Sequence, residues 1–324
     1  MTQAPIPILF LSRQVQILVG QLPESFTTLC LDDGSPVGDT AEYLARLDWL
    51  VENGKGVRAI IAAGLETLDS DMISALPDLE LVALITAGYT EIDMAAAKER
   101  GIAVTNAGDI NAGDVAEFAI ALLLTHRREM IQNHQYMLDD GWMQARRFAT
   151  RSLAEERVGI VGLGSIGKAT AERLQPFGCE IGWWGPNPKS DIAWPYYESL
   201  EALAEWATCL IICARGDEEN RGTISKSVIE KLGPDGLLVN VSRGLLVDEE
   251  AMIAALKTHK LGGAALDVFD VEPWPGSRYV DVPNLVMAPH QGGATRNSFV
   301  KTASLVRENV AHWFAGEPVT YRVI

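Results

Sequence analysis

The sequence predicts an α/β fold made of two doubly wound parallel-sheet domains. The chain has 324 residues, which is enough for about two domains that each bury a core. Short apolar runs alternate with amphipathic stretches along most of its length, as in parallel strands that are joined by helices. Hydrophobic residues make up 48% of the chain and charged residues 22%, so we expect an ordinary globular protein.

Charge and cysteine content exclude several classes of function. The chain has 27 Lys and Arg against 43 Asp and Glu, so its formal net charge is −16. Binding to nucleic acid regardless of sequence, or to an anionic membrane, needs clustered positive charge, so the acidic balance of this chain argues against both. Four scattered cysteines without a CxxC pair predict neither a disulfide framework nor a metal site. Cys209 and Cys213 lie in an apolar run that indicates core positions.

The N-terminal segment indicates a cytoplasmic protein. It lacks basic residues before its short apolar run, so we interpret that run as a first strand rather than as a signal peptide. The apolar stretch over residues 118–124 is far too short to span a membrane. We therefore expect no membrane partner.

The first hundred residues predict strands that alternate with helices. Apolar runs predict the strands, and amphipathic stretches predict the helices between them. The predicted strands cover residues 6–11, 57–63, 81–86 and 101–105, and the predicted helices cover residues 40–51 and 70–76.

One long helix is predicted next, from about residue 112 to residue 138. Asn111 is its expected N-cap, and Asp114 and Glu117 complement the positive end of the helix. The helix is apolar on more than one side, which implies burial against a large surface. That surface belongs either to the rest of this chain or to a second subunit.

A second series of strands and helices begins near Arg157. It ends in a helix over residues 297–314, which Gly316 and Pro318 terminate. The predicted strands cover residues 158–161, 180–184, 208–214, 236–242, 263–269 and 285–288, and the predicted helices cover residues 165–175, 199–206, 225–232 and 249–258.

A glycine motif stands at the first turn of this second series. It directly follows a predicted strand, opens a predicted helix, and reads Gly162, Leu163, Gly164, Ser165, Ile166, Gly167. The first glycine permits a tight turn, the second lets the backbone approach a pyrophosphate, and the third lets helix pack on strand. The helix N-terminus adds amide groups that bind phosphate. The motif predicts a dinucleotide site; a tight turn that binds nothing is the alternative.

The residue that usually selects NAD is missing. NAD sites carry an acid about twenty positions after the glycines, on the ribose 2′-hydroxyl. No carboxylate occurs here from residue 182 to residue 190. We therefore expect NADP, with Asn187 and Lys189 near the 2′-phosphate. Arg215, which ends the next strand, is a further candidate for the adenosine end. The alternative is a solvated lysine and a site that also accepts NAD.

Three polar side chains stand at or just beyond the ends of predicted strands: Arg243, Glu272 and His290. Ligands of open parallel sheets bind outside the carboxyl ends of the strands. A guanidinium polarises a carbonyl, an imidazole supplies a proton, and a carboxylate orients the imidazole, so the three fit hydride transfer at a 2-oxo acid. The structural alternatives are an ion pair for the arginine, a solvated loop position for the glutamate and a core position for the histidine.

Asp267 ends an otherwise apolar strand, where burial of a carboxylate needs compensation. We expect it to support the nicotinamide or the histidine; a structural hydrogen-bonding role is the alternative. Ser242 and Gly292 adjoin the same strand ends, and we also expect them to contact the cofactor.

These motifs resemble those of the D-isomer-specific 2-hydroxyacid dehydrogenase family. The resemblance covers essentially the whole chain, and the spacings between Arg243, Glu272 and His290 also match those of the family. Its motifs lie at residues 162–167, 240–244, 265–273 and 288–295, with N-terminal matches at residues 76–81, 86–93, 102–106 and 115–117.

The resemblance implies the roles of individual residues. It implies catalytic roles for Arg243, Glu272 and His290, of which the arginine and the histidine also bind substrate. It also implies that backbone amides around residues 87–89 bind the substrate carboxylate; these residues are Ala87, Gly88 and Tyr89. The implied reaction is the reduction of a small 2-oxo acid to its D-2-hydroxy acid.

The resemblance also implies an architecture. A Rossmann dinucleotide-binding domain over residues 104–291 is inserted into a flavodoxin-like substrate domain over residues 1–103 and 292–324. A cleft between the domains closes on substrate. Members of the family are homodimers joined through the long-helix region, so we expect a homodimer.

Departures from the family pattern refine the expectation. Gly185 replaces the aspartate typical of NAD, and Arg215 replaces a usual proline. Because Glu272 rather than glutamine pairs with the histidine, the formate dehydrogenase branch does not fit. The sequence most resembles NADP-dependent glyoxylate/hydroxypyruvate or hydroxyphenylpyruvate reductases. The alternatives are an NADH-preferring dehydrogenase, or a catalytically idle dinucleotide sensor resembling the C-terminal-binding corepressors.

Overall fold

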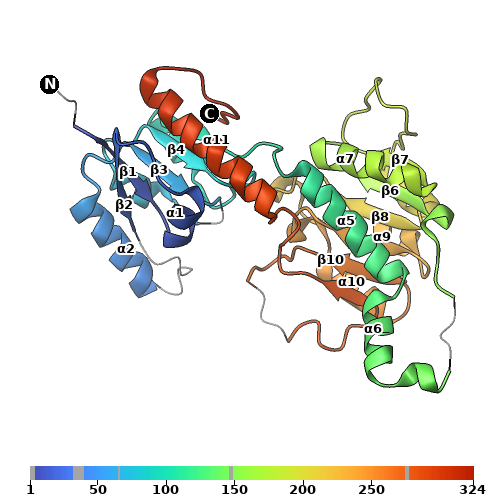
Figure 1. Ribbon diagram of the computed structural model, residues 1–324. Helices are drawn as coiled ribbons and strands as arrows, with labels where there is room; N and C mark the ends of the chain where they lie inside the picture. Colours follow the sequence, from blue (N-terminus) through green and yellow to red (C-terminus); the bar gives the residue numbers. More distant parts are fainter. Residues whose placement is uncertain (1–3, 32–39, 65, 146–148, 274–276) are drawn as a thin grey trace. The chain divides into compact units, whose positions relative to one another are not determined.

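The computed structural model describes residues 4–31, 40–64, 66–145, 149–273 and 277–324. It divides into two α/β units (Figure 1). Unit 1 comprises Met1–Ile110 and Arg296–Ile324, and unit 2 comprises Asn111–Thr295. Each unit is built on a parallel sheet, which confirms the predicted fold class. The domain boundaries expected at 103/104 and 291/292 stay predictions.

Unit 1 has a five-stranded parallel sheet in the order β2-β1-β3-β4-β5. This is the flavodoxin-like strand order. Four of its strands were predicted, with bounds one to three residues too wide, and β2 was missed. The strands are β1 (Ile6–Phe10), β2 (Phe26–Cys30), β3 (Ala59–Ala62), β4 (Leu81–Leu84) and β5 (Ala103–Thr105).

Helices cover both faces of this sheet because successive strand residues point to opposite sides. In β3, Ile60 and Ala62 pack with the side chains of α2, α3 and α4, whereas Ala59 and Ile61 pack with those of α1 and α11. The prediction missed α1 and α4, which are short. The helices are α1 (Arg13–Val19), α2 (Thr40–Asn53), α3 (Ser70–Ser74), α4 (Met94–Glu99) and α11 (Arg296–Ala315).

Unit 2 has a six-stranded parallel sheet in the order β11-β10-β9-β8-β6-β7. All six strands were predicted. The chain runs from β6 outward to β7 and then crosses back to β8, so the strand order reverses between β6 and β8. Such a switch point is where doubly wound sheets bind ligands. The strands are β6 (Arg157–Val161), β7 (Glu180–Trp184), β8 (Cys209–Ile212), β9 (Leu237–Asn240), β10 (Gly263–Leu266) and β11 (Leu285–Met287).

Helices of the described ranges pack on both faces of this sheet, two on one face and three on the other. Figure 1 shows α5 and α7 together on one side of it. The first face also buries Cys209 and Cys213, as predicted. The helices of the first face are α5 (Ala112–Arg127) and α7 (Ser165–Leu174), and those of the second are α8 (Leu200–Trp206), α9 (Lys226–Leu232) and α10 (Glu249–Lys257). Across the described ranges, no helix is both long and apolar enough to cross a membrane.

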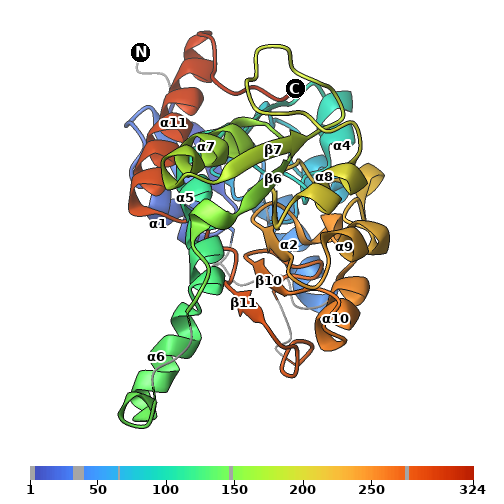
Figure 2. The same cartoon turned by 90° about the vertical axis from the view of Figure 1, so that its right-hand side faces the viewer.

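The prediction of a single helix over residues 112–138 was wrong. Helix α5 ends at Arg127, whose buried guanidinium lies 2.9 Å from Glu156 and donates to the Thr208 carbonyl at 2.7 Å. The chain then turns through Glu129, which adopts a left-handed φ of 49°. A new helix, α6 (Met130–Leu138), extends away from the body of unit 2 (Figure 2).

The N-terminus of α5 also differs from expectation. Asn111 occupies the N-cap position, but its side chain forms no capping hydrogen bond. Its amide group instead lies against Gly293, where a Cβ would approach the Asn111 nitrogen to 2.4 Å. The residue that looked like a cap is thus used in packing between α5 and the segment that follows His290.

Candidate active site

The glycine motif forms the turn between β6 and α7. Gly162 has a φ of 88°, and a Cβ there would lie 2.5 Å from Ala214 Cα. A Cβ at Gly167 would lie 2.1 Å from the Gly162 carbonyl oxygen. Gly164 is different, because a Cβ there would meet no protein atom within 4 Å. The outer glycines serve chain packing, and the middle one faces open space.

The open side of this turn fits a pyrophosphate. Gly164 is the N-cap of α7, it offers no side chain to the first-turn amides, and that turn contains no acidic residue. Uncapped amides and the positive end of the helix dipole attract phosphate. The residues present therefore fit the dinucleotide that the motif predicts.

Cationic side chains lie around the expected ribose end. Lys189 Nζ donates to the Leu163 carbonyl at 2.6 Å, so this ammonium lies against the glycine turn itself. Arg215 is 74% exposed, and its guanidinium is 3.7 Å from the carboxylate of Asp217. Asn187 is exposed in the same segment as Lys189. A 2′-phosphate at this end of the site would meet positive charge.

His290 and Glu272 form a hydrogen-bonded dyad. His290 Nδ1 lies 2.6 Å from Glu272 Oε2, and the Phe269 amide donates to Glu272 Oε1 at 2.8 Å. Because Nδ1 is bound to the carboxylate, Nε2 is the nitrogen that remains for proton exchange. His290 has a φ of 53°, a strained conformation of the kind that clusters at functional sites.

Charges around Glu272 keep its carboxylate ionised. Burial raises its pKa, but the hydrogen bond from His290, the bond from the Phe269 amide and the positive charges of His290 and Arg243 outweigh burial. The net result holds the pKa of Glu272 below its usual range. An ionised carboxylate at Nδ1 orients the imidazole.

Arg243 reaches the same region from the turn after β9. Burial lowers its pKa and the charge of Glu272 opposes this, so the two side chains interact electrostatically. The stem of Arg243 passes over Gly216, where a Cβ would lie 2.6 Å from Arg243 Cβ. Nη1 donates to the Ser242 carbonyl at 2.7 Å. The structure thus brings arginine, glutamate and histidine to one edge of the unit 2 sheet.

Sequence reasoning missed Asn240, which shapes the turn that carries the arginine. This buried residue donates to the Arg243 carbonyl at 2.9 Å and accepts from the Ser242 amide at 3.0 Å. Ser242 Oγ donates to the carbonyl of Ala214, the residue that also packs against Gly162. The sequence signal that could have identified Asn240 is a polar residue at the end of an apolar strand. Ser242 therefore ties the arginine turn to the glycine turn.

Asp267 binds the segment that carries His290, and its expected support of the nicotinamide or the histidine stays a prediction. Its carboxylate accepts the amides of Gln291 and Gly292, each at 2.7 Å, and the His290 amide donates to its carbonyl at 2.8 Å. Burial raises the pKa of Asp267, and the two backbone bonds partly oppose that rise. The side chain fixes the segment after His290, and the Gly292 amide is used in this internal bond.

In unit 1, the expected carboxylate-binding loop follows β4. Thr86 Oγ1 accepts the Gly64 amide at 2.7 Å and donates to the Gly88 carbonyl at 2.9 Å. Asn106 Nδ2 donates to the Ala87 carbonyl at 2.7 Å. Sequence reasoning named the loop but missed these two side chains, which fix its carbonyl groups. The role of residues 87–89 stays a prediction.

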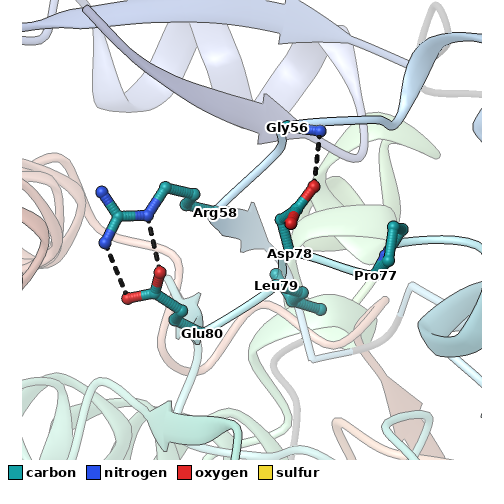
Figure 3. Close-up of a pocket in the computed structure, with 6 residues that line it drawn as sticks. All are labelled: Gly56, Arg58, Pro77, Asp78, Leu79 and Glu80. Atoms are coloured by element: carbon teal, nitrogen blue, oxygen red, sulfur yellow. Dashed lines mark hydrogen bonds and ion pairs between the residues drawn. The ribbon is translucent and has the colours of Figure 1, made fainter.

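Unit 1 also contains a cavity of about 510 Å³, shown in Figure 3. Arg58 forms two bonds to Glu80, at 2.6 and 3.0 Å, and Asp78 accepts the Gly56 amide at 2.9 Å. The cavity residues precede β3 and β4, whereas ligands of parallel sheets bind at the carboxyl ends. Arg58 and Glu80 bind each other and Asp78 binds a backbone amide, so we do not assign it a ligand.

Comparison with known proteins identifies the family. Residues 120–292 match the family model described as D-isomer specific 2-hydroxyacid dehydrogenase, NAD binding domain, over more than half of the chain. The chain belongs to this family. This confirms the resemblance drawn from the sequence motifs, and it identifies unit 2 as the part that carries the family's NAD-binding domain.

Relatives of this dehydrogenase include plant reductases. Glyoxylate/hydroxypyruvate reductase A from Arabidopsis thaliana is 35% identical over 268 residues, which cover 83% of this chain and 86% of the relative. Hydroxyphenylpyruvate reductase from Plectranthus scutellarioides is 34% identical over 280 residues, covering 86% and 90%.

A solved structure shows the same similarity. It is the NADPH-dependent glyoxylate/hydroxypyruvate reductase from Sinorhizobium meliloti in complex with NADP and malonate. Its TM-score to this chain is 0.86 at 32% identity, covering 99% of this chain and 97% of that one. The sequence prediction that this dehydrogenase is similar to such reductases is therefore confirmed.

Proposed function

We propose that this dehydrogenase reduces a small 2-oxo acid, of the glyoxylate/hydroxypyruvate or arylpyruvate type, to its D-2-hydroxy acid with NADPH. The observation that carries the proposal is the 2.6 Å bond between His290 Nδ1 and Glu272, beside Arg243, in a member of this family. The named relatives, which are glyoxylate/hydroxypyruvate and hydroxyphenylpyruvate reductases, support the substrate class.

The proposed mechanism assigns one task to each side chain. The glycine turn and the N-terminus of α7 would hold NADPH, which would supply the hydride for reduction of the carbonyl. Arg243 polarises the carbonyl and stabilises negative charge on its oxygen. His290 donates a proton to that oxygen from Nε2, and Glu272 holds Nδ1 and stabilises the charged imidazole. As part of the same proposal, amides of residues 87–89 bind the substrate carboxylate.

A panel of 2-oxo acids tests this function. Oxidation of NADPH, followed by its absorbance, should be fast with at least one short polar or aromatic 2-oxo acid and should yield the D-hydroxy acid. Chiral chromatography of the product checks the configuration. An L-hydroxy acid product, or no oxidation across the panel while NADPH binds, would contradict the proposal.

Cofactor choice is the second part of the proposal. The segment from residue 182 to 190 contains no carboxylate, and Lys189 lies against the glycine turn. These features favour NADPH because residues 182–190 contain no carboxylate that would repel a 2′-phosphate. The ratio of kcat/KM with NADPH to kcat/KM with NADH should exceed one. A clear preference for NADH would replace this part of the proposal with the NAD alternative.

The idle-sensor alternative is not favoured. The structure brings together the arginine, glutamate and histidine that the reaction needs, and the relatives named above are reductases.

We also propose a homodimer joined through the α5–α6 region. Helix α6 has no buried side chain, and it exposes apolar residues together with the turn that follows it. These residues are Met130 (57% exposed), Ile131 (54%), Met137 (52%), Leu138 (65%), Trp142 (61%) and Met143 (87%). Apolar side chains gathered on a projecting element are typical of an interface.

The cytoplasmic location expected from the sequence stays a prediction.

A further inference from the structure

A buried carboxylate lies under the segment that carries Glu272. Glu249 is the first residue of α10, and its side chain is only 6% exposed. Its Oε1 accepts the Asp270 amide at 3.0 Å, and its Oε2 lies 3.3 Å from Arg278 Nη1. One side chain therefore binds the chain both before and after Glu272.

The surroundings of Glu249 suit a fixed charge. The residue lies in the first turn of α10, where the helix dipole stabilises a negative charge. Arg278 supplies a positive partner, without which a buried charge is costly. Burial and the neighbouring charge of Glu249 raise the pKa of the Tyr279 hydroxyl, which places this tyrosine beside the same carboxylate. Tyr279 also packs on Phe269, with ring centroids 5.7 Å apart.

The amide that Glu249 binds belongs to a peptide in contact with the other catalytic segments. A Cβ at Gly244, next to Arg243, would lie 1.8 Å from Phe269 C and 2.2 Å from Asp270 N. The Phe269–Asp270 peptide thus rests directly on the arginine turn. The preceding amide, that of Phe269, donates to Glu272 Oε1. A shift of this peptide would move Glu272 relative to both His290 and Arg243.

A second attachment acts on the same segment from outside. Asp270 Oδ1 lies 2.6 Å from Arg221 Nη1, and Arg221 also pairs with Glu218 at 2.7 Å. Arg221 is 47% exposed, and exposed ion pairs contribute little. The buried bond from Glu249 is therefore the stronger constraint on the Asp270 backbone.

We propose that Glu249 is a positioning residue for catalysis, which acts through the Phe269–Asp270 peptide to hold Glu272 at His290. It touches neither substrate nor cofactor in this role. The inference rests on the proposed reductase function, because the consequence of misplacing Glu272 is measured as lost turnover.

Three variants and a neighbouring control test the role. E249A removes the acceptor and the charge, E249Q keeps an acceptor oxygen, and E249D keeps the charge on a shorter side chain. Glu250 is the matched control, because it also pairs with Arg278 but is 81% exposed and has no bond to Asp270. We expect kcat to fall about 10- to 100-fold in E249A, less in E249Q, and less than about twofold in E250A.

A double-variant cycle distinguishes positioning from general stabilisation. If Glu249 acts through Glu272, E249A should lower kcat in the natural background but hardly at all in an E272Q background. The limb of the kcat/KM pH profile that belongs to the dyad should also shift in E249A and E249Q. NADPH affinity and the urea midpoint of E249Q should stay near those of the natural chain.

The outcomes separate this inference from the function on which it rests. Absence of reductase activity in the natural chain refutes the proposed function. An active natural chain with full kcat in E249A, or equal losses from E249A with and without E272Q, refutes the positioning role alone. E249D decides the question if E249A fails to fold, because its shorter side chain keeps the charge but withdraws the acceptor from the Asp270 amide. Loss of kcat in E249D with NADPH binding intact supports the role, and full kcat refutes it.

Discussion

At the scale of single residues, the dyad of His290 and Glu272, which is proposed to transfer the proton, lies on a different segment from the turn that fits the cofactor. The imidazole is held by a carboxylate and by a strained backbone, whereas the glycine turn that fits the cofactor lies on another strand. Loss of the imidazole should therefore remove proton donation and leave the dinucleotide site intact.

The first prediction follows from this separation. His290→Ala should lower kcat by about 10²- to 10⁴-fold, the range for loss of a general acid. NADPH affinity, measured by the quenching of protein fluorescence, should change little. His312→Ala in unit 1 is the control, because this histidine is 43% exposed and remote in sequence from the motifs, and it should keep full turnover. Unchanged kcat in His290→Ala would contradict the mechanism.

The glycines of the turn lead to a second prediction. Gly164→Ala should fold as the natural chain does, because its new Cβ meets no protein atom within 4 Å, but it should bind NADPH at least about tenfold more weakly by blocking the pyrophosphate. Gly162→Ala should instead lower stability, because its φ is 88° and its Cβ would lie 2.5 Å from Ala214.

Urea unfolding and NADPH titration of both glycine variants check this contrast. Equal stability loss in the two variants, or full NADPH affinity in Gly164→Ala, would show that the middle glycine does not face the cofactor.

From the sequence, the placement of three polar residues could be predicted, whereas their catalytic roles stay predictions. Arg243, Glu272 and His290 are polar residues at or just beyond strand ends, and the structure gathers them at one edge. Glu249 was missed because the sequence shows only two adjacent acids at a helix start, with nothing to say which one is buried. Such supporting contacts depend on tertiary packing, which spacing along the chain does not encode.

At the scale of elements, strands with clear apolar runs were predicted, and a strand without such a run was not. All strands of unit 2 were predicted, and each except β11, in which only Val286 is buried, is fully or mostly buried. The edge strand β2 was missed, since its two threonines are exposed and its pattern is short. The turn at Glu129 was also missed, because the helical pattern continues across it. Helix α5 ends where Arg127 is buried against Glu156 and the Thr208 carbonyl, and these contacts cannot be seen in the sequence.

Helix α6 carries the third prediction. Ile131 and Leu138 are seven residues apart and so share one helical face. The double change Ile131→Glu and Leu138→Glu should convert the proposed dimer to a particle of 35.2 kDa, the mass of one chain, in sedimentation equilibrium. Gln132→Glu adds charge about 100° around the same helix and should leave the mass unchanged. A natural chain that sediments as a monomer would refute the dimer.

At the scale of the whole molecule, one buried histidine should make stability depend on pH. Burial, followed by the charge of Arg127, lowers the pKa of His126 to about 4, although Glu156 and the Asn284 backbone act in the opposite direction. The unfolded chain binds this proton below about pH 6.5, whereas the folded chain does not until about pH 4. The free energy of unfolding should therefore fall as pH falls through that window.

Urea unfolding at intervals from pH 8 to pH 4 checks this fourth prediction. His126→Gln removes the titrating ring, so its stability should fall less steeply between about pH 6.5 and 4 than that of the natural chain. The difference between the two curves isolates His126 from the carboxylates that both proteins share. Parallel curves would contradict a neutral, buried His126.

The two units differ in the number of chain segments that form them. Unit 2 is one continuous segment, whereas unit 1 needs α11, where Val306 and Val310 complete the core on one face of its sheet. During synthesis, the strands of unit 1 leave the ribosome long before the helix that covers them. The first unit to be made is thus the last to be finished, and until α11 is made only α1 covers this face of the sheet, which leaves apolar surface where chaperones would bind the nascent chain.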